Sequence, residues 1–156
     1  MEKVKKEIPT KLILIGDGPD RSECERLTRE LKLEKDVIFL GKQDGLENLL
    51  SVADIFLMPS QSESFGLSAL EAMACGVPVI SSSVGGLPEL VLHNKTGYIA
   101  EFSDVDRMSK YALELLTKKK KINTFSKKSR ERAEKVFEKK LIVPMYIDYY
   151  EKILSQ

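Results

Sequence analysis

Short apolar runs alternate with segments of helical periodicity over the first hundred residues. The apolar runs are rich in Leu, Ile and Val and end at glycine, proline or small polar residues, which is typical of buried parallel strands. This alternation predicts an α/β fold with an open, parallel, Rossmann-like sheet and flanking helices. The predicted strands are Leu12–Ile15, Val37–Leu40, Asp54–Met58, Val79–Ser81 and Gly97–Ala100.

Helical patterns connect these strands and then continue without them, which predicts a helical C-terminal tail. The helices expected between strands are Asp20–Lys32, Leu46–Val52, Leu67–Cys75 and Leu87–Leu92. From Asp104 onwards the strand pattern ends, and the helices expected there are Asp104–Leu116, Thr124–Phe137 and Leu141–Leu154.

The composition is that of one ordinary globular domain, residues 1–156. Hydrophobic residues make up 42% and charged residues 31%, and the two cysteines are too few for a disulfide scaffold. A single histidine cannot build a multi-ligand zinc site. No apolar stretch approaches the roughly 18–20 residues of a membrane span, and the charged N-terminus lacks the apolar core of a signal peptide. We therefore expect a cytoplasmic protein that does not associate with membranes.

The net charge of +1 hides an uneven distribution along the chain. Residues 12–100 carry 7 Lys/Arg against 13 Asp/Glu, whereas residues 101–140 carry 13 against 7. A protein that binds nucleic acid needs a basic surface, so we expect no nucleic acid as a partner. The basic run Lys118–Lys121 is interpreted as a solvated helix surface.

In open parallel sheets, ligands bind beyond the carboxyl ends of the strands. The loop after the first strand contains Gly16 and Gly18 of a dinucleotide-binding fingerprint, but Arg21 occupies the position of the third glycine. Because only two glycines match, a tight strand-to-helix turn is the favoured interpretation of this loop. The loop after the fourth strand, 81–86, is also small and glycine-rich, and could either wrap a ligand or turn a corner.

The loop after the third strand carries most of the candidate chemistry. Gly66 lets the backbone approach a ligand closely, and free N–H groups at the start of the next helix can hold phosphate oxygens. Glu63 and Glu71 can accept hydrogen bonds from hydroxyl groups, which sugars and ribose present. Ser68 to Glu71 also fits a capping box, in which Glu71 would bond to a backbone amide. Spacing alone slightly favours the capping box.

His93 and Cys75 are predicted to have no catalytic role. His93 lies in a turn without a sequence-evident partner to orient it as a base, which favours a surface histidine. Cys75 ends a helix beside Gly76 and is expected to pack against the core.

Taken together, these loops resemble the donor-binding half of the GT-B glycosyltransferases, specifically the large retaining family 4. The most specific matching piece is Glu63–Gly66 followed by Leu70–Val79, in which Glu63 and Glu71 form the E-x7-E motif of the family. The match covers about residues 11 to 154. Its other pieces are Gly16–Pro19, Phe39–Gly41, Ala53-Asp54, Pro59-Ser60, Gly85-Gly86 and Thr96–Tyr98.

The resemblance implies roles for the matched residues. Glu63 would be the catalytic residue that contacts the donor-sugar hydroxyls, and Glu71 would accept the ribose hydroxyls, which reverses the preference from spacing. The sugar and diphosphate would be held by the backbone at Ser64, Phe65, Gly66 and Leu67. The nucleobase would be lined by Phe39, Leu40 and Lys42, and Gly16 would permit close approach at the cleft.

The resemblance also implies a substrate and a missing part. Phe39–Asp44 and the long motif look most like the bacillithiol branch of the family, which transfers N-acetylglucosamine from UDP to L-malate with retention. The donor would be a UDP-sugar, with no cofactor and no metal, because amides and basic side chains neutralise the diphosphate.

A complete family member is about twice as long as this chain. An N-terminal domain that would bind the small-molecule acceptor has no counterpart here, nor has the first strand–helix unit of the donor domain with its Arg and Lys. We therefore expect the fragment to bind donor weakly and to be inactive alone. The alternative is a non-enzymatic flavodoxin-like or response-regulator-like interaction domain, for which Asp17 and Asp54 are the nearest candidate phosphorylation sites.

Overall fold

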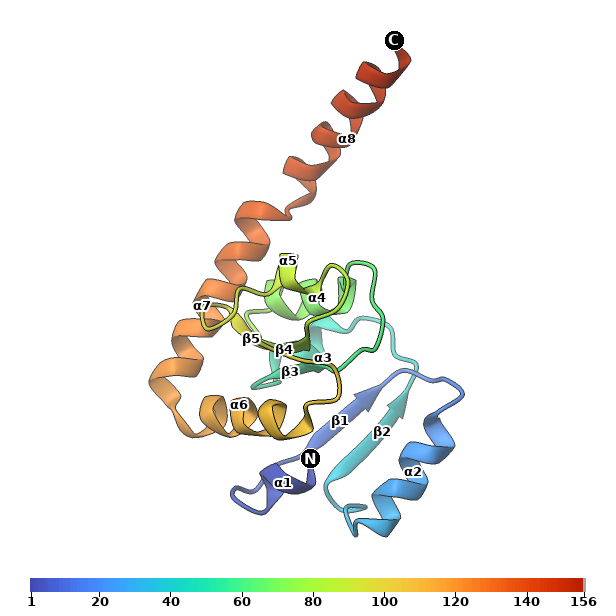
Figure 1. The fold of residues 1–156 in the computed structure, drawn as a ribbon, viewed down its shortest axis with the longest axis vertical. Coiled ribbons are helices and arrows are strands. Elements are labelled where there is room, and N and C mark those ends of the chain that lie inside the picture. The colour runs from blue at the N-terminus through green and yellow to red at the C-terminus, as the bar shows by residue number, and fades with distance from the viewer. Residues whose placement is uncertain (156) are drawn as a thin grey trace.

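The computed structural model describes residues 1–155 and has the expected α/β fold, in which all paired strands are parallel (Figure 1). Each strand begins and ends within two residues of its predicted range. The largest difference is at the third strand, which starts at Phe56 because Ala53 still donates its N–H to the carbonyl of Leu50 in a helical turn. The strands are β1 (Leu12–Ile15), β2 (Val37–Gly41), β3 (Phe56–Met58), β4 (Val79–Ser82) and β5 (Gly97–Ala100).

The strands form two hydrogen-bonded sheets rather than one continuous sheet. β1 pairs with β2, with Leu12 opposite Val37. β4 lies between β3 and β5, with Val79 opposite Phe56 on one side and Gly97 on the other. Over residues 1–155, β1 and β3 are not paired with each other, so each has one edge without a neighbouring strand.

The core is centred on the three-stranded sheet. Val79 on one face of β4 packs with residues of α4 (Leu67–Ala74) and α5 (Leu87–Leu90), and Ile80 on the other face packs with α6 (Val105–Thr117). The strands beside the unpaired edges are less covered: the side chains of Ile13, Ile15 and Leu57 are 41%, 37% and 38% exposed. Burial on both faces therefore holds for β4 but not for β1 or β3.

The remaining helices are α1 (Glu2–Lys5), α2 (Arg21–Glu30), α3 (Glu47–Ser51), α7 (Lys119–Val136) and α8 (Lys139–Leu154). In Figure 1, α4 and α5 cover one side of the three-stranded sheet, α6 lies on the other, and α8 projects away from the body of the molecule. α7 begins five residues before the predicted Thr124, so it includes Lys119–Lys121 of the lysine run, with Lys118 as its N-cap. No helix among residues 1–155 is both long and apolar enough to cross a membrane.

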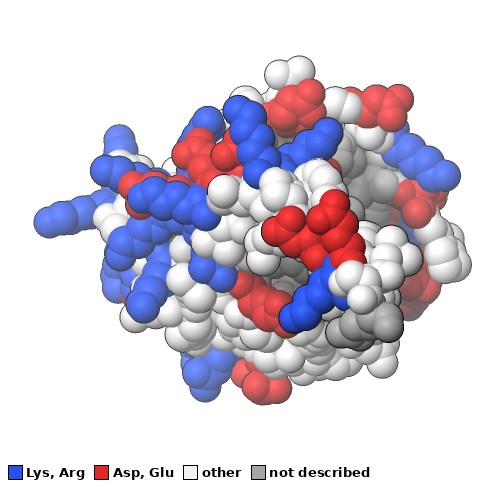
Figure 2. All heavy atoms as spheres, turned by 90° about the horizontal axis from the view of Figure 1, so that it is seen from above, with Lys and Arg blue, Asp and Glu red and all other residues white. Residues whose placement is uncertain are grey.

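The basic C-terminal region forms a solvated surface along α7, as predicted. Lys119, Lys120, Lys127 and Lys128 are exposed, and in Figure 2 Lys and Arg side chains gather on the side of the molecule where α7 lies. The opposite face of α7 is buried, and there the Ser129 hydroxyl donates a hydrogen bond to the Thr96 carbonyl oxygen at 2.6 Å.

Candidate functional site

The segment between β3 and α4, residues 59–66, is called here the Glu63 loop. Its backbone rests on the segment between β4 and α5. The Ser82 hydroxyl at the end of β4 donates to the Ser60 carbonyl oxygen at 2.5 Å, and the Gly86 N–H donates to the Ser64 carbonyl oxygen at 3.1 Å. The loop after the fourth strand therefore supports the Glu63 loop.

Two glycines allow this close backbone contact. A Cβ atom built on Gly85 would lie 1.5 Å from the Glu63 carbonyl oxygen, and one built on Gly86 would lie 2.6 Å from the Ser64 carbonyl oxygen. Both distances are shorter than any ordinary carbon–oxygen contact. The sequence left open whether Gly85-Gly86 wraps a ligand or turns a corner, and in the structure these residues hold the Glu63 loop in place.

Gly66 ends the Glu63 loop and begins α4. Its φ of +91° lies in the left-handed region that favours glycine, and a Cβ there would lie 2.6 Å from Cδ2 of the buried Leu87. The first N–H groups of a helix have no intrahelical acceptor, and the helix dipole makes this end attractive to anions. At this end the Leu67 side chain is exposed. The start of α4 is therefore accessible to an anionic group.

The carboxylates of Glu63 and Glu71 flank the start of α4 without protein partners. Glu63 is half-buried and Glu71 is exposed, and within residues 1–155 neither carboxylate makes a hydrogen bond or an ion pair. The capping-box interpretation of Glu71 is wrong, because the N-cap of α4 is Gly66 and the Ser68 hydroxyl points to the Met58 sulfur at 3.4 Å. Both carboxylates are thus free to accept hydrogen bonds from a ligand.

The other predicted site residues lie together at the ends of β1 and β2. The Gly16 N–H donates to the Gly41 carbonyl oxygen at 2.8 Å, and the Phe39 ring lies 5.9 Å from the guanidinium of Arg21. Lys42 is exposed. Leu40 is half-buried, and its carbonyl oxygen accepts from the Gln43 side chain. The structure therefore brings the candidates together in two groups, one per sheet: Gly16 with Phe39–Lys42, and Ser64–Leu67 with both glutamates.

His93 is exposed, as predicted for a surface histidine, and Cys75 packs against the core, as predicted. His93 Nδ1 accepts a hydrogen bond from the Ile99 N–H at 3.1 Å, and its ring contacts Tyr98 and Tyr111 edge-on. Cys75 is half-buried against the apolar cluster below α4. Within the described part of the chain, no three His, Cys, Asp or Glu side chains come together as a metal site would require.

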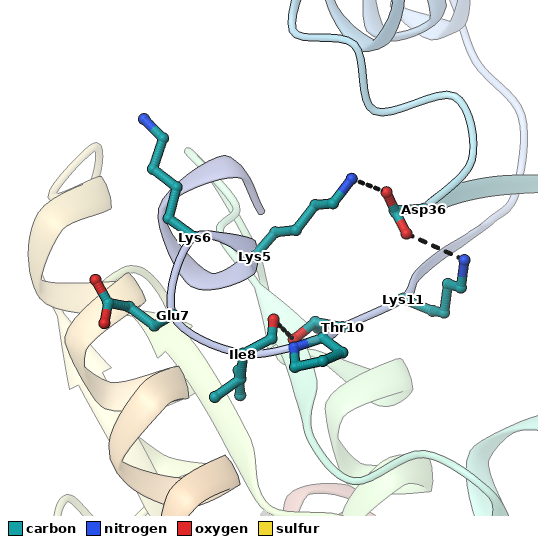
Figure 3. Close-up of a pocket in the computed structure, with 8 residues that line it drawn as sticks. Lys5, Lys6, Glu7, Ile8, Thr10, Lys11 and Asp36 are labelled. Carbon is teal, nitrogen blue, oxygen red and sulfur yellow. Dashed lines mark hydrogen bonds and ion pairs between the residues drawn. The ribbon is translucent and has the colours of Figure 1, made fainter.

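A hollow of about 580 Å³ lies at the opposite end of β1 and β2, away from both groups of candidates (Figure 3). Lys5 and Lys11 both point to Asp36 there. The hydrogen bond from Lys5, followed by the one from Lys11, lowers the pKa of Asp36. Asp36 offsets one of the two lysine charges, and the hollow lies where the strands begin rather than at their carboxyl ends, so it is not the expected ligand site.

Sequence comparison places this chain among known proteins. The family described as "Glycosyl transferases group 1" matches residues 1–132. The chain is 40% identical over 152 residues to "N-acetyl-alpha-D-glucosaminyl L-malate synthase" of Bacillus anthracis, covering 97% of this chain and 40% of that protein. It is also 40% identical over 114 residues to a protein of Corynebacterium glutamicum named "GDP-mannose-dependent monoacylated alpha-(1-6)-phosphatidylinositol monomannoside mannosyltransferase", covering 67% of this chain and 29% of that protein.

Solved structures with a similar fold superpose on almost the whole of this chain. A sucrose-phosphate synthase from Thermosynechococcus elongatus superposes with a TM-score of 0.89 at 32% identity, covering 99% of this chain and 42% of that one. Anabaena Alr3699/HepE in complex with UDP-glucose superposes with a TM-score of 0.87 at 25% identity, covering 99% and 44%. This chain therefore spans less than half the length of these relatives.

Proposed function

Because the chain belongs to the glycosyl transferases group 1 family, we propose that it is the nucleotide-sugar-binding part of a glycosyltransferase, with a UDP-sugar as donor. The observation that carries the proposal is the pair of unpartnered carboxylates, Glu63 and Glu71, beside the open start of α4. The family match disfavours the flavodoxin-like or response-regulator-like alternative. In addition, Asp17 accepts a bond from the N–H of Gly18 within a turn instead of lining an acidic pocket.

The chemistry of transfer suits the Glu63 loop. The bond between the anomeric carbon and the diphosphate oxygen breaks, a bond from that carbon to an acceptor hydroxyl oxygen forms, and the hydroxyl proton passes to an oxygen of the departing diphosphate. Glu63 would accept hydrogen bonds from the sugar hydroxyls and face the positive charge that develops on the sugar. Backbone amides of Phe65, Gly66 and Leu67, aided by the dipole of α4, would stabilise the departing diphosphate.

Glu71 and the ends of β1 and β2 would bind the nucleoside. Glu71 has no competing partner, so its carboxylate can accept both ribose hydroxyls. Phe39, Leu40 and Lys42 would line the base. Gly16 leaves room for close approach, because a Cβ added there would have no heavy atom within 4 Å. In this assignment a single bound nucleotide contacts both groups of candidate residues.

The finer proposal is transfer of N-acetylglucosamine to L-malate with retention at the anomeric carbon. Its support is the 40% identity to the Bacillus anthracis protein of that name. A relative of equal identity is named as GDP-mannose-dependent, so the nucleobase has to be tested separately.

The split sheet supports a proposal about the rest of the enzyme. The N–H groups of Leu12 and Gly16 point to β2 and that of Phe56 points to β4, so those of Ile13, Ile15 and Leu57 point to the unpaired edges. We propose that in the longer protein one further parallel strand lies between β1 and β3, joined through a helix to α1. That strand–helix unit would add the basic side chains for the diphosphate, and a separate domain would bind the acceptor.

The fragment alone would then bind donor weakly and not turn over. Hydrogen exchange tests the strand proposal directly. The amides of Ile13 and Leu57 should exchange fast in this chain and at least about 100-fold more slowly in the longer protein, because a pairing strand would protect them. Equal rates in both would refute it.

Titration of the ¹⁵N-labelled chain with UDP, GDP and UDP-N-acetylglucosamine tests the donor assignment. UDP should shift the amides of Phe65–Leu67 at millimolar concentration. Glu71→Gln should weaken UDP binding about tenfold, the loss of a charge-assisted hydrogen bond. The matched control is Glu34→Gln, an exposed carboxylate at the amino end of β2, which should bind UDP like the wild type. Shifts confined to other regions, or a stronger response to GDP, would contradict the assignment.

A further inference from the structure

Phe65 of the Glu63 loop packs against a residue 72 positions later in the chain. Its ring meets the ring of Phe137 edge-on, with 5.8 Å between centroids and 68° between planes. Both rings are half-buried and border the same apolar cluster as α4 and α5. Edge-to-face contact of this kind orients one ring relative to the other, because the positive edge of one ring prefers the negative face of its neighbour.

Phe137 lies at the break between two helices. α7 ends at Val136, Glu138 has an extended backbone, and α8 begins at Lys139. No residue of α8 is buried, and Phe137 at this break is the last of residues 1–155 that packs against the apolar cluster. Phe137 is therefore the place where the last helix and the Glu63 loop meet.

Arg132 fixes the Phe137 ring and also the end of α5. Its guanidinium lies 5.3 Å from the Phe137 ring centroid, while Nε donates to the Leu90 carbonyl oxygen at 2.8 Å and Nη2 to the Glu89 carbonyl oxygen at 2.5 Å. Leu90 in turn lies against Gly66, where a Cβ would approach its Cδ1 to 3.3 Å. The end of α7 thus reaches the Glu63 loop in two ways: directly through Phe137 and Phe65, and indirectly through Arg132 and Leu90.

We propose that Phe137 is a positioning residue for the Glu63 loop, and hence for the donor site that the proposed function places there. Its ring holds the side chain of Phe65, and the Phe65 backbone carries the amides expected to face the diphosphate. With Phe137 shortened, the Phe65 ring loses its orienting neighbour and the loop samples additional conformations. Donor affinity then falls because only part of the population has the binding geometry.

The test compares Phe137→Leu with Phe125→Leu in the 156-residue chain. Phe125 is a buried residue of α7 that packs with Tyr98 in the other cluster, so the control removes an aromatic ring from the same region of the chain without touching the Glu63 loop. Phe137→Leu should shift the ligand-free amide resonances of Ser64–Leu67 and weaken UDP binding about five- to tenfold. Phe125→Leu should lower the melting temperature at least as much yet leave those resonances and the affinity unchanged, and Phe137→Tyr should restore both.

The Ser64–Leu67 amide resonances test the positioning role of Phe137, and the UDP affinity of the wild-type chain tests the proposed donor-binding function on which that role rests. If Phe137→Leu leaves the Ser64–Leu67 resonances in place, the positioning role is refuted whatever the affinity. Equal effects of both variants on those resonances would also refute it, because general destabilisation would then be sufficient. If the wild-type chain binds no UDP, the proposed function fails. The positioning role of Phe137 still stands in that case, provided that Phe137→Leu, and not Phe125→Leu, shifts the Ser64–Leu67 resonances.

Discussion

Substitution of Gly85 by alanine tests whether the Glu63 loop depends on backbone contact with the loop after β4. The Cβ of the new residue would lie 1.5 Å from the Glu63 carbonyl oxygen, whereas real Cβ contacts keep at least 3.0 Å. The two backbones would therefore have to separate by about 1.5 Å. Because neither atom belongs to a flexible side chain, no rotamer change can relieve the clash.

The expected loss of stability has two parts. A residue with a Cβ in the left-handed conformation, here φ +52°, costs about 1–2 kcal/mol. Forcing an atom into a packed contact adds about 1–3 kcal/mol. For a chain of this length, 1 kcal/mol lowers the melting temperature by about 2–4 °C, so the summed loss of about 2–5 kcal/mol should lower the melting temperature of Gly85→Ala by about 4–20 °C.

The matched control is Gly45→Ala. Gly45 has φ +66°, but the nearest atom to its Cβ position is a Glu47 carboxylate oxygen at 3.8 Å, so this variant carries the backbone strain without the clash. Thermal unfolding followed by circular dichroism gives both melting temperatures, and UDP titration gives both affinities. Gly85→Ala should be less stable than Gly45→Ala and should bind UDP more weakly. If the two variants agree within error in both measurements, Gly85 does not support the Glu63 loop as described.

Three further predictions concern pH, a buried hydroxyl and metal ions. The hydrogen bond from Tyr98, followed by that from Lys118, lowers the pKa of Glu114 from 4.5 to about 2. The ionised carboxylate therefore stabilises the fold above pH 4.5, and this contribution is lost as the pH falls from 4.5 toward 2. The melting-temperature advantage of the wild type over Glu114→Gln should shrink across that interval, and a constant advantage would contradict the coupling. Ser129→Ala leaves the buried Thr96 carbonyl without its hydroxyl donor, so the free energy of unfolding measured by chemical denaturation should fall by about 1–3 kcal/mol. In the control Ser109→Ala, the lost hydrogen bond is exposed and the residue is half-buried, so the free energy of unfolding should fall by less than about 0.5 kcal/mol. UDP affinity should be the same in EDTA and in millimolar Mg²⁺, and a clear gain with Mg²⁺ would show that the diphosphate needs a metal.

The order and type of the elements between β1 and β5 could be predicted because each strand is a short apolar run closed by turn residues. Boundaries were less accurate where propensity gives no sharp signal. Lys119 and its neighbours have good helix propensity but lack the apolar periodicity that marks a packed helix, and the structure includes them in α7 although the predicted helix begins at Thr124.

The capping-box error has a similar local origin. Ser68 and Glu71 have the required spacing, but the N-cap of α4 is Gly66, whose backbone is left-handed and whose Cβ position lies too close to Leu87 for any other residue. The predicted helix Leu67–Cys75 begins where α4 begins, so the error was to assign the N-cap to Ser68, which is already the second residue of the helix. The position of the Glu63 carboxylate before that helix, in contrast, followed from the loop sequence alone.

The sequence by itself determined the α/β class, the strand order along the chain and the loops in which the candidate ligands lie, because periodicity and turn residues act within about ten residues. Only the tertiary structure decided that β1 and β3 are unpaired, that Gly85 contacts Glu63, and that Phe137 meets Phe65. Each of these features depends on how segments far apart in the chain lie relative to one another. The distances between such segments depend on how the helices and sheets pack together. No short stretch of sequence contains a signal for that packing.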